Sequence, residues 1–320
     1  MNEIDVFCCA ECGKDGGVSL KTCKACMRVK YCGATCQHKH WPKHKIPCKI
    51  RVAELRDEAL FKDPPPKEEC EICFLPMPTK LITCMSLPPA TISSVPIYDF
   101  AIDNAGLADK DIQFYYPCCG KNICKGCWYS KGKSGNNDKF KCPFCNSKGS
   151  KTDEEQFEKL TKRVEANDPD SVHVLAHYYY HGLGGMQQNC EKALELLTRS
   201  ADLGCSKAHN NMGLHYYDGG DMKKAKFHYE AAAMAGHVLA RNNVGIIEAK
   251  SGNMERAVKN WRIAAAGGEF YAMHSLQMMF EDGLVNRETI NSTLTAYNNS
   301  CSEMRSEARD SFIRSQSNTN

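Results

Sequence analysis

The 320-residue sequence has no long apolar run and no recognisable leader. Residues 1–5 lack the basic and then apolar pattern of a signal peptide, and no apolar stretch approaches the roughly 20 residues of a membrane span. A P-loop, a nucleophile elbow and a paired-carboxylate pocket are also missing. These absences argue against secreted, membrane and common hydrolase classes. We therefore expect an intracellular protein, cytoplasmic or nuclear, without an active site of its own.

Acidic residues are missing from one stretch near the start. Residues 21–51 contain nine Lys or Arg and no Asp or Glu, although the net charge of the whole chain is only +3. Such a basic patch, with Tyr31 and Trp41 interleaved, could neutralise nucleic-acid phosphates. The same stretch contains five cysteines, at positions 23, 26, 32, 36 and 48, and the interpretation that we favour is that its lysines offset the negative charge of thiolates bound to a metal ion. Nucleic acid is therefore not the expected partner.

Cysteine is abundant, and 17 of the 20 cysteines precede residue 146. Two residues between cysteines let one turn of backbone place both sulfurs on one tetrahedral zinc ion, and eight ligands make two closed, structural sites. A disulfide framework, the alternative, would need an oxidising compartment. Because large apolar residues are few, zinc must supply most of the folding energy, on the order of 10–16 kcal/mol per site. The first eight ligands have these spacings: Cys9-x2-Cys12, Cys23-x2-Cys26, Cys32-x3-Cys36 and His44-x3-Cys48.

Residues 31–44, closed by Cys48, resemble the second half of the MYND zinc finger. The resemblance implies a cross-brace, in which Cys8 is a bystander. It also implies a groove beside Gln37 and Trp41 that takes short proline-containing peptides, although Lys24 replaces a small polar residue found in some peptide-binding members. Packing on the zinc fold is the alternative role of Trp41. The implied zinc ligands are Cys9, Cys12, Cys32 and Cys36 for one ion and Cys23, Cys26, His44 and Cys48 for the other.

Residues 49–61 carry apolar side chains at intervals that predict a short amphipathic helix. Three prolines, at 64–66, then end it and favour an extended spacer. We assign residues 1–61 to the finger and residues 62–69 to a proline-rich linker.

A second set of cysteines lies between residues 70 and 145. The sequences of residues 114–120 and 123–128 resemble those of the RING finger, in the four-plus-four cysteine form of Not-type ubiquitin ligases. We assign it to residues 70–148, with a long first loop and a short strand before Pro117. Cys118 and Cys119 are adjacent, which departs from the family spacing, so Cys84 is an alternative ligand. The implied ligands are Cys70, Cys73, Cys124 and Cys127 for one zinc and Cys118, Cys119, Cys142 and Cys145 for the other.

A RING finger performs no covalent chemistry but positions a ubiquitin-charged conjugating enzyme. The resemblance implies a docking surface at Ile72, Trp128 and Pro143. Their alternative roles are structural: Ile72 and Pro143 fill turns, and Trp128 would be the only large core residue. Asn146 stands where many RING fingers carry an arginine that contacts both enzyme and ubiquitin. Asparagine lacks the charge and reach of arginine, which lowers the expectation of ligase activity.

An internal repeat of 32 residues marks the second half of the chain. Within each unit a helix such as 208–217 is followed by a glycine-containing turn and a second helix such as 222–235. The pattern resembles the Sel-like subclass of tetratricopeptide hairpins, which implies an all-α solenoid with a concave surface for partners. We assign the repeats to residues 149–285. The repeating columns are Ala193, Ala225 and Ala257; Ala201, Ala233 and Ala265; Gly204, Gly236 and Gly268; and Ala208, Ala240 and Ala272.

The repeats suggest few further sites. Thr152 and Glu155 have the register of a capping box. We expect the aromatic residues and histidines of the first helices, including His177 and Tyr178, to pack between hairpins, with the concave surface as their alternative place. Cys190, Cys205 and Cys301 are expected as small buried hydrophobes. A long polar helix over 286–314 should cap the solenoid within a C-terminal segment 286–320.

These patterns predict two small zinc-stabilised folds followed by an all-α solenoid, with four Zn²⁺ ions as cofactors. The expected function is that of a zinc-binding adaptor or scaffold for other proteins. The alternative is a RING-type ubiquitin ligase, in which the 70–148 module engages a conjugating enzyme while the finger and the repeats select the substrate.

Overall fold

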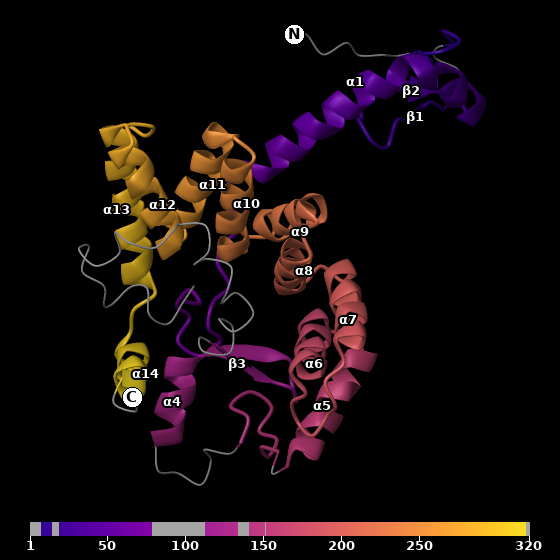
Figure 1. The fold of residues 1–320 in the computed structure, drawn as a ribbon. Coiled ribbons are helices and arrows are strands. Elements are labelled where there is room, and N and C mark those ends of the chain that lie inside the picture. Colours follow the sequence, from indigo (N-terminus) through magenta and orange to yellow (C-terminus); the bar gives the residue numbers. More distant parts are fainter. Residues whose placement is uncertain (1–7, 15–18, 79–112, 134–140, 151, 318–320) are drawn as a thin grey trace. The chain divides into compact units, whose positions relative to one another are not determined.

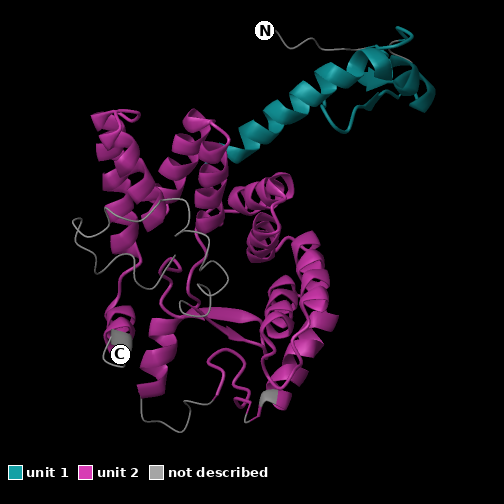
Figure 2. Ribbon diagram, in the orientation of Figure 1, with its two compact units in different colours: residues 1–63 teal, residues 64–320 magenta. Residues whose placement is uncertain are grey.

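The computed structural model describes residues 8–14, 19–78, 113–133, 141–150 and 152–317 (Figure 1). Cys84 and most of the long loop after Cys73 lie outside these residues. The chain forms two compact units, Met1–Asp63 and Pro64–Asn320 (Figure 2).

The first unit joins a short hairpin to one long helix. Strands β1 (Lys21–Thr22) and β2 (Lys30–Tyr31) pair antiparallel, and helix α1 runs over Ala34–Leu60. The expected helix over 49–61 was therefore too short, because the preceding residues 34–48 are helical despite Pro42 and Pro47. The core of the unit contains four cysteines and Tyr31. Few apolar side chains support this fold, as the sequence predicted.

The second unit begins with a small module around a hairpin. Strands β3 (Gln113–Tyr116) and β4 (Lys121–Cys124) pair antiparallel, and helix α4 (Lys125–Lys133) follows at once. The strand expected before Pro117 is therefore present. Ile123 and Tyr116 are buried among cysteines. Sulfur again makes up much of the core.

Helical hairpins follow one another along the rest of this unit. Consecutive helices pack against each other in the pairs α6 with α7, α8 with α9, and α10 with α11. Thr152 caps α5 by accepting the N–H of Glu155, as its capping register predicted. The helices are α5 (Asp153–Glu165), α6 (Pro169–His181), α7 (Cys190–Asp202), α8 (Ser206–Asp218), α9 (Met222–Met234), α10 (Val238–Lys250), α11 (Met254–Ala266), α12 (Phe270–Glu281) and α13 (Arg287–Glu303).

The 32-residue period places small residues where helices meet. All nine alanines of the repeating columns are buried. A side chain on Gly245 would meet the indole of Trp261 at 2.5 Å, and one on Gly213 would meet the ring of Tyr229 at 2.5 Å. These two pairs are one period apart, so glycine on the first helix admits an aromatic ring from the second. Gly236 begins the next turn with φ +90°, which glycine adopts without strain.

The C-terminal segment differs from the expected single helix. Helix α13 ends at Glu303, and a separate helix α14 covers Glu307–Ser317. The hydroxyl of Ser306 accepts the N–H of Arg309 at 3.3 Å, which starts the new helix. Helix α13 packs on α11 and α12 at the end of the repeats, whereas α14 packs on α4. The capping role therefore falls to α13 alone.

The three late cysteines were expected to be buried. Cys205 and Cys301 are buried, but Cys190 is exposed at the start of α7, so the expectation was wrong for Cys190. First-turn positions of a helix lie at its end, where the backbone meets solvent, and hydrophobicity alone does not predict their burial.

Candidate metal centres

Cysteine and histidine side chains gather in four clusters. Within each cluster the candidate ligand atoms all lie within 4.8 Å of one another. The same four sets follow from the family ligand orders. The clusters are Cys9, Cys12, Cys32 and Cys36; Cys23, Cys26, His44 and Cys48; Cys70, Cys73, Cys124 and Cys127; and Cys118, Cys119, Cys142 and Cys145.

Helix α1 connects the two clusters of the first unit. It supplies Cys36 to one cluster, and His44 and Cys48 to the other. His44 and Cys48 are four residues apart and therefore share one helix face. The Nε2 atom of His44 lies 3.4 Å from the Sγ atom of Cys26. A break in this helix would disturb both clusters together.

The same backbone turn closes every Cys-x2-Cys pair except Cys124 and Cys127, which lead into helix α4. The residue after the second cysteine has a positive φ, and its N–H donates to the carbonyl of the first cysteine. Asparagine tolerates this left-handed conformation better than most residues, so the backbone favours asparagine at position 146. The four turn residues are Gly13 (φ 68°), Met27 (58°), Phe74 (55°) and Asn146 (58°), with N–H to carbonyl distances of 2.9, 3.0, 2.8 and 3.0 Å.

A tight turn between β3 and β4 lets adjacent cysteines serve one cluster. The N–H of Cys119 donates to the carbonyl of Tyr116 at 3.2 Å, and that of Gly120 donates to the same carbonyl at 2.8 Å. Gly120 has φ +74°, a conformation that glycine allows. Cys118 and Cys119 therefore both reach Cys142 and Cys145.

The clusters fit zinc. Four sulfurs at 2.3 Å from a tetrahedral ion lie about 3.8 Å apart. Five Sγ–Sγ pairs within the clusters are 3.5 to 3.9 Å apart, and the ligand atoms of each cluster all lie within 4.8 Å of one another. Four ligands of this kind would leave no open position for substrate, so a zinc ion held by them would be structural.

Electrostatics within a cluster also favour a cation. Backbone N–H groups of Cys12 and Cys32 lower the pKa of Cys9 to about 6, because they stabilise its thiolate. A hydrogen bond with Cys32 raises the pKa of Cys36 to about 12, because it stabilises the thiol form. The first thiol of the cluster to ionise therefore loses its proton readily, whereas the last thiol retains its proton. A divalent cation would favour the fully ionised set of ligands.

Gln37 and Trp41 lie one turn apart on α1, and both are exposed. Trp41 is 41% exposed, and its ring meets His44 edge-on at 6.1 Å between centroids. Trp41 therefore packs against the candidate zinc ligand His44, and part of its ring remains accessible to solvent.

The residues of the predicted conjugating-enzyme surface are also accessible. Ile72 is 37% and Trp128 is 40% exposed, and Pro143 is exposed. The alternative role of Trp128 as the only large core residue was wrong, because Ile123 and Tyr116 fill that core. Trp128 instead stacks on Phe114 at 5.6 Å between centroids.

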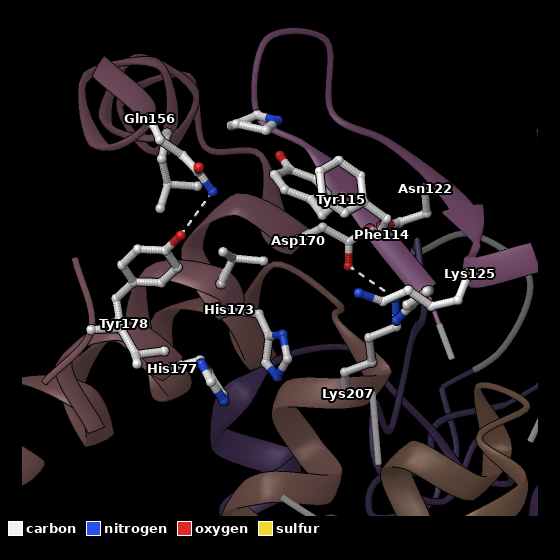
Figure 3. Close-up of a pocket in the computed structure, with 15 residues that line it drawn as sticks. Phe114, Tyr115, Asn122, Lys125, Gln156, Asp170, His173, His177, Tyr178 and Lys207 are labelled. Carbon is white, nitrogen blue, oxygen red and sulfur yellow. Dashed lines mark hydrogen bonds and ion pairs between the residues drawn. The ribbon is translucent and has the colours of Figure 1, made fainter. Parts of the chain in front are cut away.

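A cavity of about 360 Å³ lies between the β3–β4 hairpin and helices α5, α6 and α8 (Figure 3). His177 and Tyr178, which we expected to pack between hairpins, line it. Asp170 is balanced there by Lys125 and Lys207, so charge does not select one class of ligand. The cavity therefore lies at the contact between the hairpin and the first repeat.

Comparison with known families gives two matches. The MYND finger model matches residues 9–48, and the Sel1 repeat model matches residues 169–205, 206–237 and 244–269. The chain contains a MYND finger and Sel1 repeats. The MYND finger is a zinc-binding module, and both kinds of domain mediate protein interactions. This is therefore a zinc-binding protein with protein-interaction modules.

Two solved structures with Sel1-type repeats are similar to this chain. A Sel1 repeat protein from Oxalobacter formigenes is 22% identical, covers 56% of this chain and 71% of its own, and has a TM-score of 0.42. The protective antigen c5321 of uropathogenic Escherichia coli, which displays an SLR fold, is 24% identical. That match covers 53% of this chain and 41% of the antigen, with a TM-score of 0.39. Across the ranges that the structure describes, no helix has the length and apolar character needed to cross a membrane.

Proposed function

We propose that the protein is a zinc-dependent scaffold, with zinc at all four clusters, that holds partner proteins in a fixed arrangement. The observation that carries this proposal is the packing of the central module, residues 70–148, on the first Sel1 repeat. The hydroxyl of Tyr115 lies 3.4 Å from Asp168, and Asn122 donates to Asp170 at 3.2 Å. Both acidic residues stand at the start of α6.

A lysine side chain adds to the contact between the central module and the first repeat. The ammonium of Lys207 on α8 lies 3.7 Å from Asp170 and 3.6 Å from Glu68, which precedes the first cysteine of the module. The side chain of Lys207 is only 10% exposed, so solvent screens these pairs less than surface pairs. A partner bound to the module would therefore keep a defined orientation to one bound to the repeats.

The finger would supply a further binding surface, for short proline-containing peptides beside Gln37 and Trp41. Trp41→Ala should weaken peptide binding at least about tenfold, because exposed tryptophans dominate interface energies. An array of proline-containing peptides would identify a binder, and fluorescence anisotropy would measure its affinity. Ile46→Ala is the matched control, since Ile46 is 69% exposed on the same helix. Equal affinities for both variants would exclude this surface.

A second candidate function is that of a ubiquitin ligase. The accessible Ile72, Trp128 and Pro143 on a cross-braced zinc module favour it, because a RING finger needs an open apolar surface to dock its conjugating enzyme. In this case the finger and the repeats would select the substrate. The module would contribute positioning and no covalent step.

Autoubiquitination with a panel of conjugating enzymes separates the two functions. If the protein is a ligase, Ile72→Ala should lower the rate at least about tenfold, because it removes a central docking contact. Tyr180→Ala, at an exposed aromatic residue on α6, should leave the rate unchanged. Zinc stoichiometry is measured on the same samples.

Each result has a distinct meaning. Four zinc ions and no activity with any enzyme would leave the scaffold as the function. Two or three zinc ions would show that at least one cluster does not bind metal as proposed, and the cluster with the adjacent Cys118 and Cys119 would be the first to test by mutation.

A further inference from the structure

The C-terminal helix α14 packs on the central zinc module, far from it in sequence. Its neighbour α4 starts directly after Cys124 and carries Cys127. The two backbones approach closely, since a side chain on Gly126 would meet the backbone of Arg309 at 2.6 Å. The rings of Tyr129 and Phe312 extend this contact, with centroids 5.7 Å apart.

Arg309 is the charged residue at the centre of this contact. It is only 5% exposed. Its guanidinium donates to the carbonyls of Pro76 at 2.8 Å, Met304 at 2.5 Å and Leu75 at 3.3 Å. It also donates to the Sγ atom of Cys73 at 3.6 Å. Among the described residues it forms no ion pair with a carboxylate.

A buried guanidinium of this kind needs a source of negative charge. Burying an unpaired cation costs several kcal/mol in effective desolvation. A zinc ion bound by four thiolates carries a net negative charge, because four anionic ligands outweigh one divalent cation. Hydrogen bonds from outside the ligand set commonly orient such ligands and stabilise the metal complex.

We infer that Arg309 is the outer-sphere cation of the site formed by Cys70, Cys73, Cys124 and Cys127, and that docking of α14 and zinc binding stabilise each other. This inference rests on the proposed zinc occupancy of that cluster. Because α14 covers the face of α4 that carries Gly126 and Tyr129, Trp128 stays accessible. The C-terminal helix thus completes the zinc module without covering its candidate docking surface.

The first test is zinc release from the full-length protein, followed with a chromogenic zinc indicator. Arg309→Met should speed the loss of one zinc ion at least about tenfold, in the range found for outer-shell partners. Arg305→Met is the matched control, because Arg305 is 54% exposed and pairs with Asp310. Equal release rates for Arg309→Met and the native protein would overturn the inference.

A second pair of variants separates docking from charge. Gly126→Ala should displace α14 and also speed zinc release, whereas Gly132→Ala on the same helix meets no atom within 4 Å. Hydrogen exchange of residues 307–317 in the native protein tests the reverse direction without any variant. Chelation should remove the protection of these amides, and unchanged protection would overturn the inference. If Cys127→Ser leaves the zinc content unchanged, the zinc assignment fails instead.

Discussion

Chelation of zinc should unfold the MYND finger and the central module while most of the helical circular dichroism remains. The cores of both modules consist largely of candidate ligands, so removal of the proposed zinc ions would take away their main source of stability. The repeat core is built from apolar side chains such as Trp261 and Leu276. Far-UV circular dichroism with excess chelator measures the remaining helix.

Hydrogen exchange would locate the loss within the chain. Protection should disappear from residues 9–63 and from the module at 70–148, and should persist in α6–α13. Addition of zinc should restore the lost protection. Loss of most of the ellipticity would show instead that the repeats depend on metal.

Cys36→Ser should remove both zinc ions of the finger and leave those of the central module in place. Helix α1 carries ligands of both finger clusters, so the loss of one cluster should destabilise the other. Residues 1–63 form a compact unit, which confines the damage. Zinc content should fall from about four to about two ions per chain, with each structural ion contributing on the order of 10 kcal/mol.

Cys8→Ser is the control for this variant. It makes the same chemical change beside a ligand, but Cys8 belongs to none of the four clusters. Its zinc content should equal that of the native protein. Release of zinc from the central module in Cys36→Ser would contradict the independence of the two units.

Local spacing accounts for what the sequence predicted well. Cysteine pairs separated by two residues indicate the turns that hold both sulfurs of a pair near one ion, whereas the grouping of the pairs into clusters was predicted from the family resemblances. The alanine and glycine columns predicted the repeats because close helix packing admits only small residues there. These signals are short in range or strictly periodic.

Helix α1 shows where local spacing misleads. The ligands and prolines among residues 34–48 indicate a zinc site and give no amphipathic period, so the sequence predicted only the last part of this helix. Residues 34–48 supply ligands to both clusters of the finger, and each cluster also takes ligands from other segments of the finger. The full length of α1 therefore follows from the folded finger and not from its own sequence.

Long-range packing accounts for the other features that the sequence did not predict. The docking of α14 has no periodic signal, because it depends on contacts between residues more than 200 positions apart. Arg309 was missed for the same reason, since a lone arginine in a polar helix resembles a solvated side chain. Only the packed structure shows it buried.

The contact between Arg309 and Cys73 joins residues 236 positions apart in the chain. A ribosome releases the chain from its N-terminus, and domains generally fold as units while synthesis continues. The finger can fold once residue 63 has emerged. Helix α14 can dock on the central module only after residue 309 has emerged, and by then the repeats have been made. On the proposed coupling, the site that contains Cys73 therefore gains its outer-sphere cation last, and it exchanges its metal more readily for most of the time that translation takes.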